Sequence, residues 1–153
     1  MADLTIQNEI VVDAPQTVVW QTIADPDQIP LWFADRVDVE VKPGASGVFV
    51  FEDHATKKAT TAAITIETVE PPRLLAFRWG HPQGAEPRAE NSILVRFTLT
   101  AEADERTRVR VVESGLEEVR WPAPDKTRYA DDHRNGWAVH FGRLVELFAG
   151  RAR

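Results

Sequence analysis

Alternating apolar and polar side chains mark most of the chain between residues 37 and 113 as β-strand. The three valines of residues 37–41, for example, alternate with charged side chains, which is the pattern of a strand buried on one face. Short turns separate successive runs of this kind, so neighbouring strands are expected to pair antiparallel. The predicted strands cover residues 6–12, 37–41, 48–52, 60–69, 74–79, 93–99 and 109–113. Because helices do not alternate with these strands, a doubly wound α/β fold is disfavoured.

Two short helices are predicted between the first strand and the second. Residues 16–24 place apolar side chains at helical spacing, and they follow Asp13 and Pro15, a capping residue and a first-turn proline. Asp25 and Pro26 repeat this start signal. We therefore expect a second short helix, which carries the Leu-Trp-Phe triplet that follows, with its regularity limited by a further proline.

The last quarter of the chain predicts one long helix of about 25 residues that begins at Asp125. Aromatic and apolar side chains recur there at spacings of three or four, which gives the helix one continuous apolar face. This face consists of Tyr129, His133, Trp137, Phe141, Leu144 and Phe148. Gly136 and Gly142 each cost about 1 kcal/mol relative to alanine inside a helix. We expect close packing of the helix backbone against the sheet to account for both glycines.

Together these elements predict an α+β fold, in which about seven antiparallel strands form one strongly curved sheet around the long helix. The five Trp and seven Phe side chains fall mostly on the two surfaces that face each other. One interpretation of these aromatic side chains is a solid core between helix and sheet. The other, which we adopt as the hypothesis, is an internal cavity that they line.

Composition restricts the classes of protein that fit the chain. Its 153 residues are expected to form one domain, residues 1–153, and the absence of cysteine excludes disulfides and thiolate metal sites. A net charge of −6 argues against a nucleic-acid-binding protein, which needs a basic face. No apolar stretch approaches the roughly 20 residues that span a bilayer, and the first residues lack the features of a secretory signal. We therefore expect a cytoplasmic protein without a membrane span.

Four segments of the chain together resemble one known superfamily. They are DAPQTVVWQTIADPDQIPLWF (13–33), EPPRLLAFRW (70–79), VVESGL (111–116) and NGWAVHFGRLVELF (135–148). Their order and spacing are similar to the SRPBCC (START-like, Bet v-like) superfamily, and most of all to the family related to the C-terminal domain of the activator of heat-shock protein 90 ATPase. The resemblance implies a helix-grip fold, in which a seven-stranded antiparallel sheet grips the C-terminal helix, often around a hydrophobic ligand cavity. Because the superfamily includes lipid and hormone binders and aromatase/cyclases, it implies where a ligand lies but not its identity.

Glu113 is a charged residue in the predicted core. Its strand phase places it with Val109 and Val111, toward the long helix. A carboxylate in an apolar enclosure must be paired, hydrogen-bonded or protonated. Candidate partners on the helix are His133, Asn135 and Trp137. Two roles stay open for this carboxylate: a polar anchor or general acid/base at one end of the cavity, or a structural hydrogen bond that fixes the loop that follows.

No metal or cofactor site is predicted. The four histidines are His54, His81, His133 and His140, and only the last two share an element. Seven residues apart on a helix, these two are separated by about 10.5 Å of rise, whereas one zinc ion holds each nitrogen at about 2.0–2.1 Å. Ser114 lacks the first glycine of the G-x-S-x-G elbow, and no glycine-rich nucleotide motif occurs.

The function predicted from these features is the binding of a small hydrophobic or aromatic ligand between sheet and helix. The loop of residues 80–90 and the loop that carries Trp121 are expected to form a flexible gate. Predicted ligand-binding residues are Trp32, Phe33, Phe49, Phe51, Ile64, Ile66, Phe77, Trp79, Val95, Phe97, Glu113, His133, Trp137, Phe141 and Leu144. Two alternatives stay open: an enzyme of cyclase or isomerase type with Glu113 or His133 as acid/base, and a co-chaperone-like interaction module, which the family name suggests.

Overall fold

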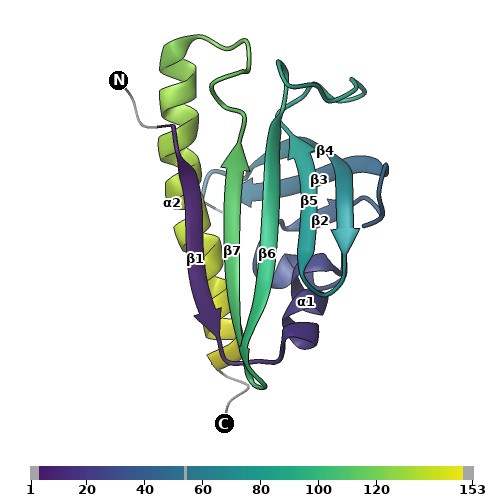
Figure 1. Cartoon of the computed structure of the whole chain (residues 1–153). Coiled ribbons are helices and arrows are strands. Elements are labelled where there is room, and N and C mark those ends of the chain that lie inside the picture. The colour runs from purple at the N-terminus through teal and green to yellow at the C-terminus, as the bar shows by residue number, and fades with distance from the viewer. Residues whose placement is uncertain (1–3, 54, 150–153) are drawn as a thin grey trace.

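A seven-stranded antiparallel sheet curves against one long helix in the computed structural model of the chain, which describes residues 4–53 and 55–149 (Figure 1). The strands are β1 (Ile6–Val12), β2 (Arg36–Asp38), β3 (Ser46–Asp53), β4 (Lys58–Glu70), β5 (Leu74–Trp79), β6 (Ile93–Ala103) and β7 (Arg106–Ser114). The helices are α1 (Gln16–Ala24), the short 3₁₀ helix η1 (Ile29–Leu31) and α2 (Ala123–Ala149). In the strand order β1-β7-β6-β5-β4-β3-β2, the first strand pairs with the last. This architecture confirms the predicted α+β helix-grip fold.

The side chains of β7 alternate between the two faces of the sheet as the sequence predicts. Val109, Val111 and Glu113 are buried, whereas Arg108 and Arg110 are more exposed and belong to the opposite face. Since α2 packs beside β1, the neighbour of β7, the buried face of β7 is the face turned toward the helix (Figure 1). The strand therefore places one carboxylate in the apolar interior.

The second short helix is much less regular than expected, because it is reduced to the single turn η1. Pro30 lies within this turn and has no N–H to continue a helix. The next residues, Trp32, Phe33 and Ala34, are all buried, which one face of a helix cannot achieve. The Trp32 indole N–H also donates to the backbone oxygen of Thr22 at 2.9 Å, which holds the segment against α1.

The second predicted strand is also shorter than expected and ends at Asp38. Beyond Asp38 the chain passes directly over Gly47 instead of extending the ladder. A Cβ atom built on Gly47 would collide with the backbone oxygen of Asp38 and would lie 2.6 Å from the Cβ of Val39. Glycine is therefore required at position 47, because the backbone of residues 38–39 passes too close for a side chain. The same crossing ends β2 at Asp38.

The two glycines of α2 do not have the packing role that the sequence suggested. The helix buries Trp137, Phe141 and Phe148 toward the interior, as expected from their spacing. A Cβ built on Gly136 or on Gly142, however, would meet no atom within 4 Å apart from the adjacent residues and backbone of its own helix, so the expectation of close packing against the sheet is wrong. In the described part of the chain no helix is long and apolar enough to cross a membrane.

Replacing Gly47 by alanine is expected to lower the free energy of unfolding by about 1–3 kcal/mol, because the added methyl group overpacks against backbone that cannot move away. Gly142→Ala is the matched control, since the same methyl group enters open space on a helix and should stabilise by up to about 1 kcal/mol. Urea unfolding of both variants measures the difference. Equal changes in the free energy of unfolding for Gly47→Ala and Gly142→Ala would contradict the close contact between Gly47 and the backbone of Asp38.

Candidate functional site

The buried carboxylate of Glu113 lies at the centre of the candidate site. Glu113 is the penultimate residue of β7 and pairs with Val95 of β6 and Ile6 of β1, so neighbouring strands cover it on both sides. Its side chain has no exposed surface. An ionised group in this position is stable only when hydrogen bonds replace the water that it has lost.

Four donors surround this carboxylate. Its Oε1 accepts hydrogen bonds from the Trp79 indole N–H at 3.0 Å and from the Tyr129 hydroxyl at 2.5 Å. Its Oε2 accepts from His133 Nδ1 and from the Trp137 indole N–H, each at 2.7 Å. A carboxylate offers about four lone-pair sites, so these four donors fill them. The Trp79 N–H is shared, because it also donates to the Tyr129 oxygen at 2.8 Å.

Stacked rings fix the donors from α2. The Tyr129 and His133 rings lie face to face, with centroids 3.7 Å apart and planes 18° apart. Burial raises the pKa of the Tyr129 phenol, and the nearby charge of Glu113 raises it further. The hydroxyl of Tyr129 therefore stays protonated and acts as a donor to the carboxylate.

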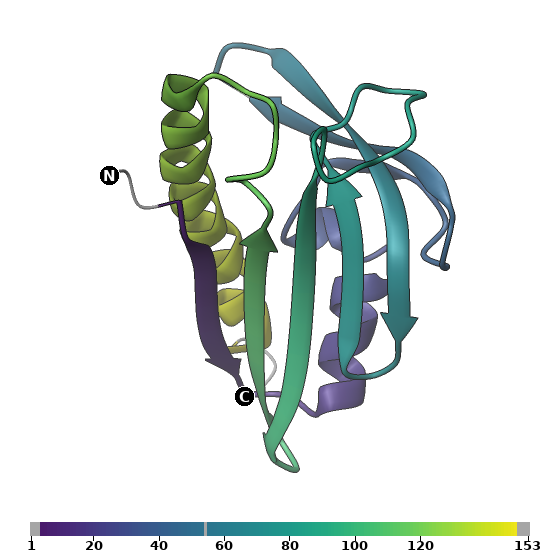
Figure 2. The same ribbon diagram turned by 45° about the horizontal axis from the view of Figure 1, so that its top comes forward.

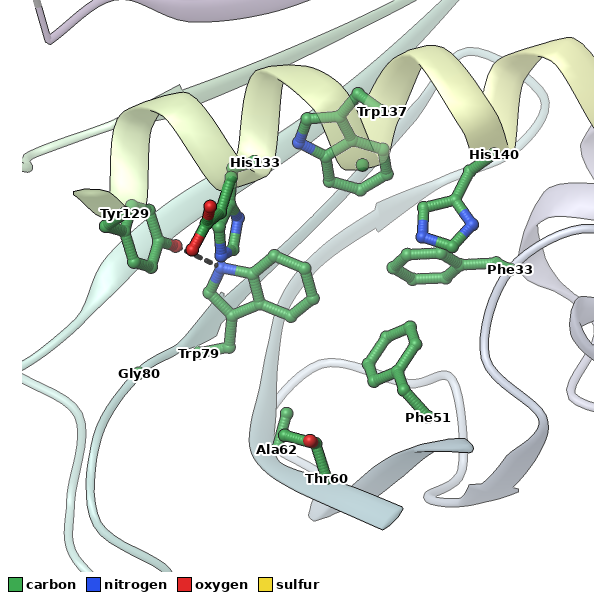
Figure 3. Close-up of a pocket in the computed structure, with 12 residues that line it drawn as sticks. Phe33, Phe51, Thr60, Ala62, Trp79, Gly80, Tyr129, His133, Trp137 and His140 are labelled. Atoms are coloured by element: carbon green, nitrogen blue, oxygen red, sulfur yellow. Dashed lines mark hydrogen bonds between the residues drawn. The ribbon is translucent and has the colours of Figure 1, made fainter. Parts of the chain in front are cut away.

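A pocket of about 330 Å³ opens in front of this network, between α2 and the ends of β3, β4 and β5 (Figure 3). His133 and Trp137 border it from the helix, and Phe51 borders it from the sheet, with Phe33 and His140 together at one end (Figure 3). The complete lining is Phe33, Phe51, Thr60, Ala62, Trp79, Gly80, Tyr129, Asp132, His133, Gly136, Trp137 and His140. The space next to Gly136, where a Cβ would meet no neighbour, belongs to this pocket.

The pocket has mostly aromatic walls and little charge. Among the described lining residues Asp132 is the one with a formal charge at neutral pH, and no lysine or arginine takes part. Burial lowers the pKa of His140 to about 4, and the charge of Arg143 acts in the same direction. His140 is therefore neutral at physiological pH, and its ring edge packs on Phe33 with centroids 5.0 Å apart.

The structure divides the predicted ligand-binding residues into two groups. Those that line the pocket are Phe33, Phe51, Trp79, His133 and Trp137, and Glu113 lies directly behind them. Those packed in the buried core are Trp32, Phe49, Ile64, Ile66, Phe77, Val95, Phe97, Phe141 and Leu144. The interior is thus solid over most of its length and hollow at one end. A role in ligand binding stays a prediction for all of these residues.

Some lining residues were not among the predicted ones, although a signal for them exists. Tyr129 lies four residues before His133 on α2, and so it shares the face of the helix that reaches Glu113. Thr60 and Ala62 continue the strand phase of Ile64 beyond the core to the rim, where small side chains leave room. Of the expected partners of Glu113, His133 and Trp137 bond to it, whereas Asn135 is exposed on α2.

The predicted gate loops lie together at one end of the sheet. The loop after β5 and the loop after β7 both rise at the same end (Figure 2), and the Arg120 backbone N–H donates to the Glu90 oxygen at 2.9 Å. A Cβ built on Gly80, which lines the pocket, would lie 3.5 Å from the Trp121 ring. Trp121 also packs on Tyr129, with centroids 5.3 Å apart. Gating by these loops stays a prediction.

Within residues 4–53 and 55–149, no group of three or more His, Asp or Glu side chains could hold a metal ion. His54, one of the four histidines considered for a metal site, lies outside the described residues. His133 and His140 both border the pocket, but each has its own surroundings: His133 bonds to Glu113, and His140 packs on Phe33.

Comparisons with known proteins find similarity at the level of family and fold. The family model described as Activator of Hsp90 ATPase homolog 1-like protein matches residues 13–149. The structure is similar to that of protein MLL2253 from Mesorhizobium loti, with 23% identity, a TM-score of 0.70, and 94% of this chain and 95% of that chain covered. It is also similar to the Aha1 dimer from Colwellia psychrerythraea, with 16% identity, a TM-score of 0.67, and coverage of 94% and 95%. At these identities the likeness shows the fold alone.

A further similar structure is DynU16, a protein of the dynemicin biosynthetic locus. The identity is 28% and the TM-score is 0.70, and the match covers 94% of this chain. Since it covers 46% of DynU16, the chain spans about half the length of that protein. No curated protein matches the sequence.

Replacing Glu113 by glutamine is expected to lower the free energy of unfolding by about 2–3 kcal/mol. The amide nitrogen faces two of the four donors whichever way it turns. On the Oε2 side the Trp137 indole N–H loses its acceptor, and on the Oε1 side the Tyr129 hydroxyl loses the oxygen to which it donates. Glu117→Gln, an exposed position in the next loop, is the matched control with an expected change within about 0.5 kcal/mol. Urea unfolding measures both changes, and an equally small effect at Glu113 would contradict the four-donor network.

The lowered pKa of His140 predicts a pH dependence of stability. Because the unfolded histidine titrates near 6.5, the unfolded chain binds the proton at higher pH than the folded chain. The free energy of unfolding contributed by neutral His140 is fully present above pH 6.5, and up to about 3 kcal/mol is lost as the pH falls from about 6.5 to about 4. The measurement is urea unfolding across this range for the natural protein and His140→Gln. If the free energy of unfolding changed with pH in the same way in both proteins, His140 would not be the source of the pH dependence.

Proposed function

The chain belongs to the Activator of Hsp90 ATPase homolog 1-like family, and from this premise we propose that it binds a small, neutral aromatic molecule in the pocket between α2 and the sheet. The observation that carries the proposal is the aromatic pocket of about 330 Å³, whose few polar side chains come mostly from α2. Small-molecule sites have this character, with mostly apolar walls and a few placed polar groups. Burial of the apolar surface of the ligand supplies the driving force, about 25 cal/mol per Å².

The volume of the pocket supports a ligand of one or two rings. Small-molecule sites range over about 300–1,000 Å³, and this pocket is at the lower end. Flat walls such as Trp79 and Trp137, whose planes are 23° apart, favour flat ligands. A long acyl chain would need the space that the packed core residues already fill.

Charge around the pocket supports a neutral ligand. Asp132 is on the rim and Glu113 is buried behind the wall, and both are negative. Arg143 is close enough to act on His140 at the other end, but it does not line the pocket. No lysine or arginine lies among the described lining residues to pair with an acidic ligand. An aromatic carboxylate would therefore lose its hydration without gaining a cationic partner, and it is expected to bind more weakly than its neutral counterpart.

The other predictions about function rest on different grounds. The likeness of the fold to solved structures supports a site between sheet and helix but does not specify a ligand. A co-chaperone-like interaction rests on the family name, and a cytoplasmic location rests on composition. Both stay predictions.

Gly136→Leu is expected to weaken binding strongly without unfolding the protein. The new side chain starts in open space and extends into the pocket, and leucine is a better helix former than glycine by roughly 0.5–1 kcal/mol. The probe is prodan, a neutral two-ring dye whose emission shifts to the blue in apolar surroundings. Its affinity should fall at least about tenfold, which corresponds to about 1.4 kcal/mol.

Gly142→Leu is the matched control for this experiment. It makes the same change on the exposed side of the same helix, and prodan affinity should stay as in the natural protein. Fluorescence titration and thermal unfolding are measured for all three proteins. If Gly136→Leu binds prodan as tightly as Gly142→Leu, the pocket is not the binding site and the proposed function is wrong.

A further inference from the structure

Building on the binding function proposed above, on which this inference rests, we propose that the pocket selects aromatic ligands that carry a hydrogen-bond donor, such as a phenolic hydroxyl. The atom that accepts this bond is His133 Nε2, and Glu113 acts as the positioning residue for the imidazole. The contacts of His133, its surroundings and the charges near the pocket lead to this assignment step by step.

The proton on His133 is fixed at Nδ1 by Glu113. The distance from Nδ1 to Glu113 Oε2 is 2.7 Å, and an ionised carboxylate can only accept. The remaining capacity of the carboxylate is filled by two indole N–H groups, which can only donate, and by the Tyr129 hydroxyl. An ionised Glu113 has no proton to offer, so Nδ1 is the donor of the pair.

Neighbouring rings hold the imidazole in this orientation. Tyr129 stacks on one face at 3.7 Å between centroids, and Trp79 approaches it at 5.4 Å with planes 87° apart. A half-turn of the ring would bring a C–H group against Glu113 Oε2. One acceptor site of a buried carboxylate would then be empty, at a cost of about 1–3 kcal/mol.

A ring with a single proton, held on Nδ1, carries a lone pair on Nε2. The two ring nitrogens point in different directions, so Nε2 is turned away from Glu113. The His133 side chain keeps 27% of its surface exposed while Glu113 keeps none, and His133 borders the pocket. The acceptor of the pair thus lies on the accessible side, and the carboxylate that orients it lies on the buried side.

An acceptor in an aromatic pocket selects ligands with a donor. A methyl ether of the same shape leaves the lone pair of His133 without a partner after its water is displaced, which is the costly case for a buried polar atom. The negative charges of Asp132 and Glu113 disfavour an ionised phenolate and so favour the neutral hydroxyl. His140, at the end of the pocket next to Phe33, is neutral, and Arg143, whose charge acts on His140, does not line the pocket.

The experiment compares naphthol with its methyl ether, methoxynaphthalene, which has the same rings but no donor. Both are titrated against the tryptophan fluorescence of the full chain at a pH where naphthol is neutral. We expect naphthol to bind about three- to tenfold more tightly, the range of one hydrogen bond. In His133→Phe the two affinities should become equal, whereas Asn135→Ala, on the exposed side of α2, should keep the natural ratio.

The outcomes separate this inference from the proposed function. If methoxynaphthalene and prodan bind but naphthol has no advantage, the role of His133 is wrong and the aromatic pocket still stands. If none of the three compounds binds, the proposed function itself fails. An advantage for naphthol that persists in His133→Phe would assign the acceptor to another group and overturn the inference.

A second measurement does not depend on the folding of any variant. Nitrogen NMR of isotope-labelled histidine distinguishes the two neutral tautomers in the natural protein above the titration range of histidine. We expect His133 to carry its proton on Nδ1, and addition of naphthol should shift the Nε2 resonance while methoxynaphthalene should not. A proton on Nε2 instead would overturn the inference, because that nitrogen could then only donate.

Discussion

A single buried negative charge organises this molecule. The carboxylate of Glu113 has lost its water, so every acceptor site on it has to be filled by the protein. Three of the four donors, Tyr129, His133 and Trp137, come from α2 at intervals of four residues, which places them on consecutive turns of one face. The fourth, Trp79, comes from β5. The hydrogen bonds of Glu113 thus fix the rotation of α2 about its axis and its position along the sheet.

The pocket follows from the same arrangement. Side chains that are committed to Glu113 cannot turn to fill the space in front of them, and Gly136 contributes no side chain to fill it from the helix. Further along α2, Phe141 and Leu144 have no such commitment, and they pack fully against the sheet. The polar network therefore separates a solid core from a hollow end. The donors that satisfy the carboxylate also form one wall of the cavity.

The sequence predicts the fold well because alternation along strands and spacing along helices are local properties. It predicts Glu113 for the same reason, since strand phase alone turns this residue inward. Trp79 as a partner of Glu113 was not predicted, because β6 lies between their strands and the offset across two ladders depends on non-local pairing. Gly47 and Gly136 were equally hard to predict, since a close approach and an empty space both depend on which segments meet in three dimensions.

The pairing of β1 with β7 has a consequence for how the protein is made on the ribosome. Ile6 lies beside Glu113 in the sheet, so β1 can pair with its neighbour only after β7 has been synthesised. Such distant pairing is slow to form and leaves an unpaired strand edge in the meantime. The donors on α2 are synthesised later still, and until they arrive the Glu113 carboxylate keeps its water. Closure of the sheet and burial of the charge are therefore late events, and the nascent chain holds no completed pocket before them.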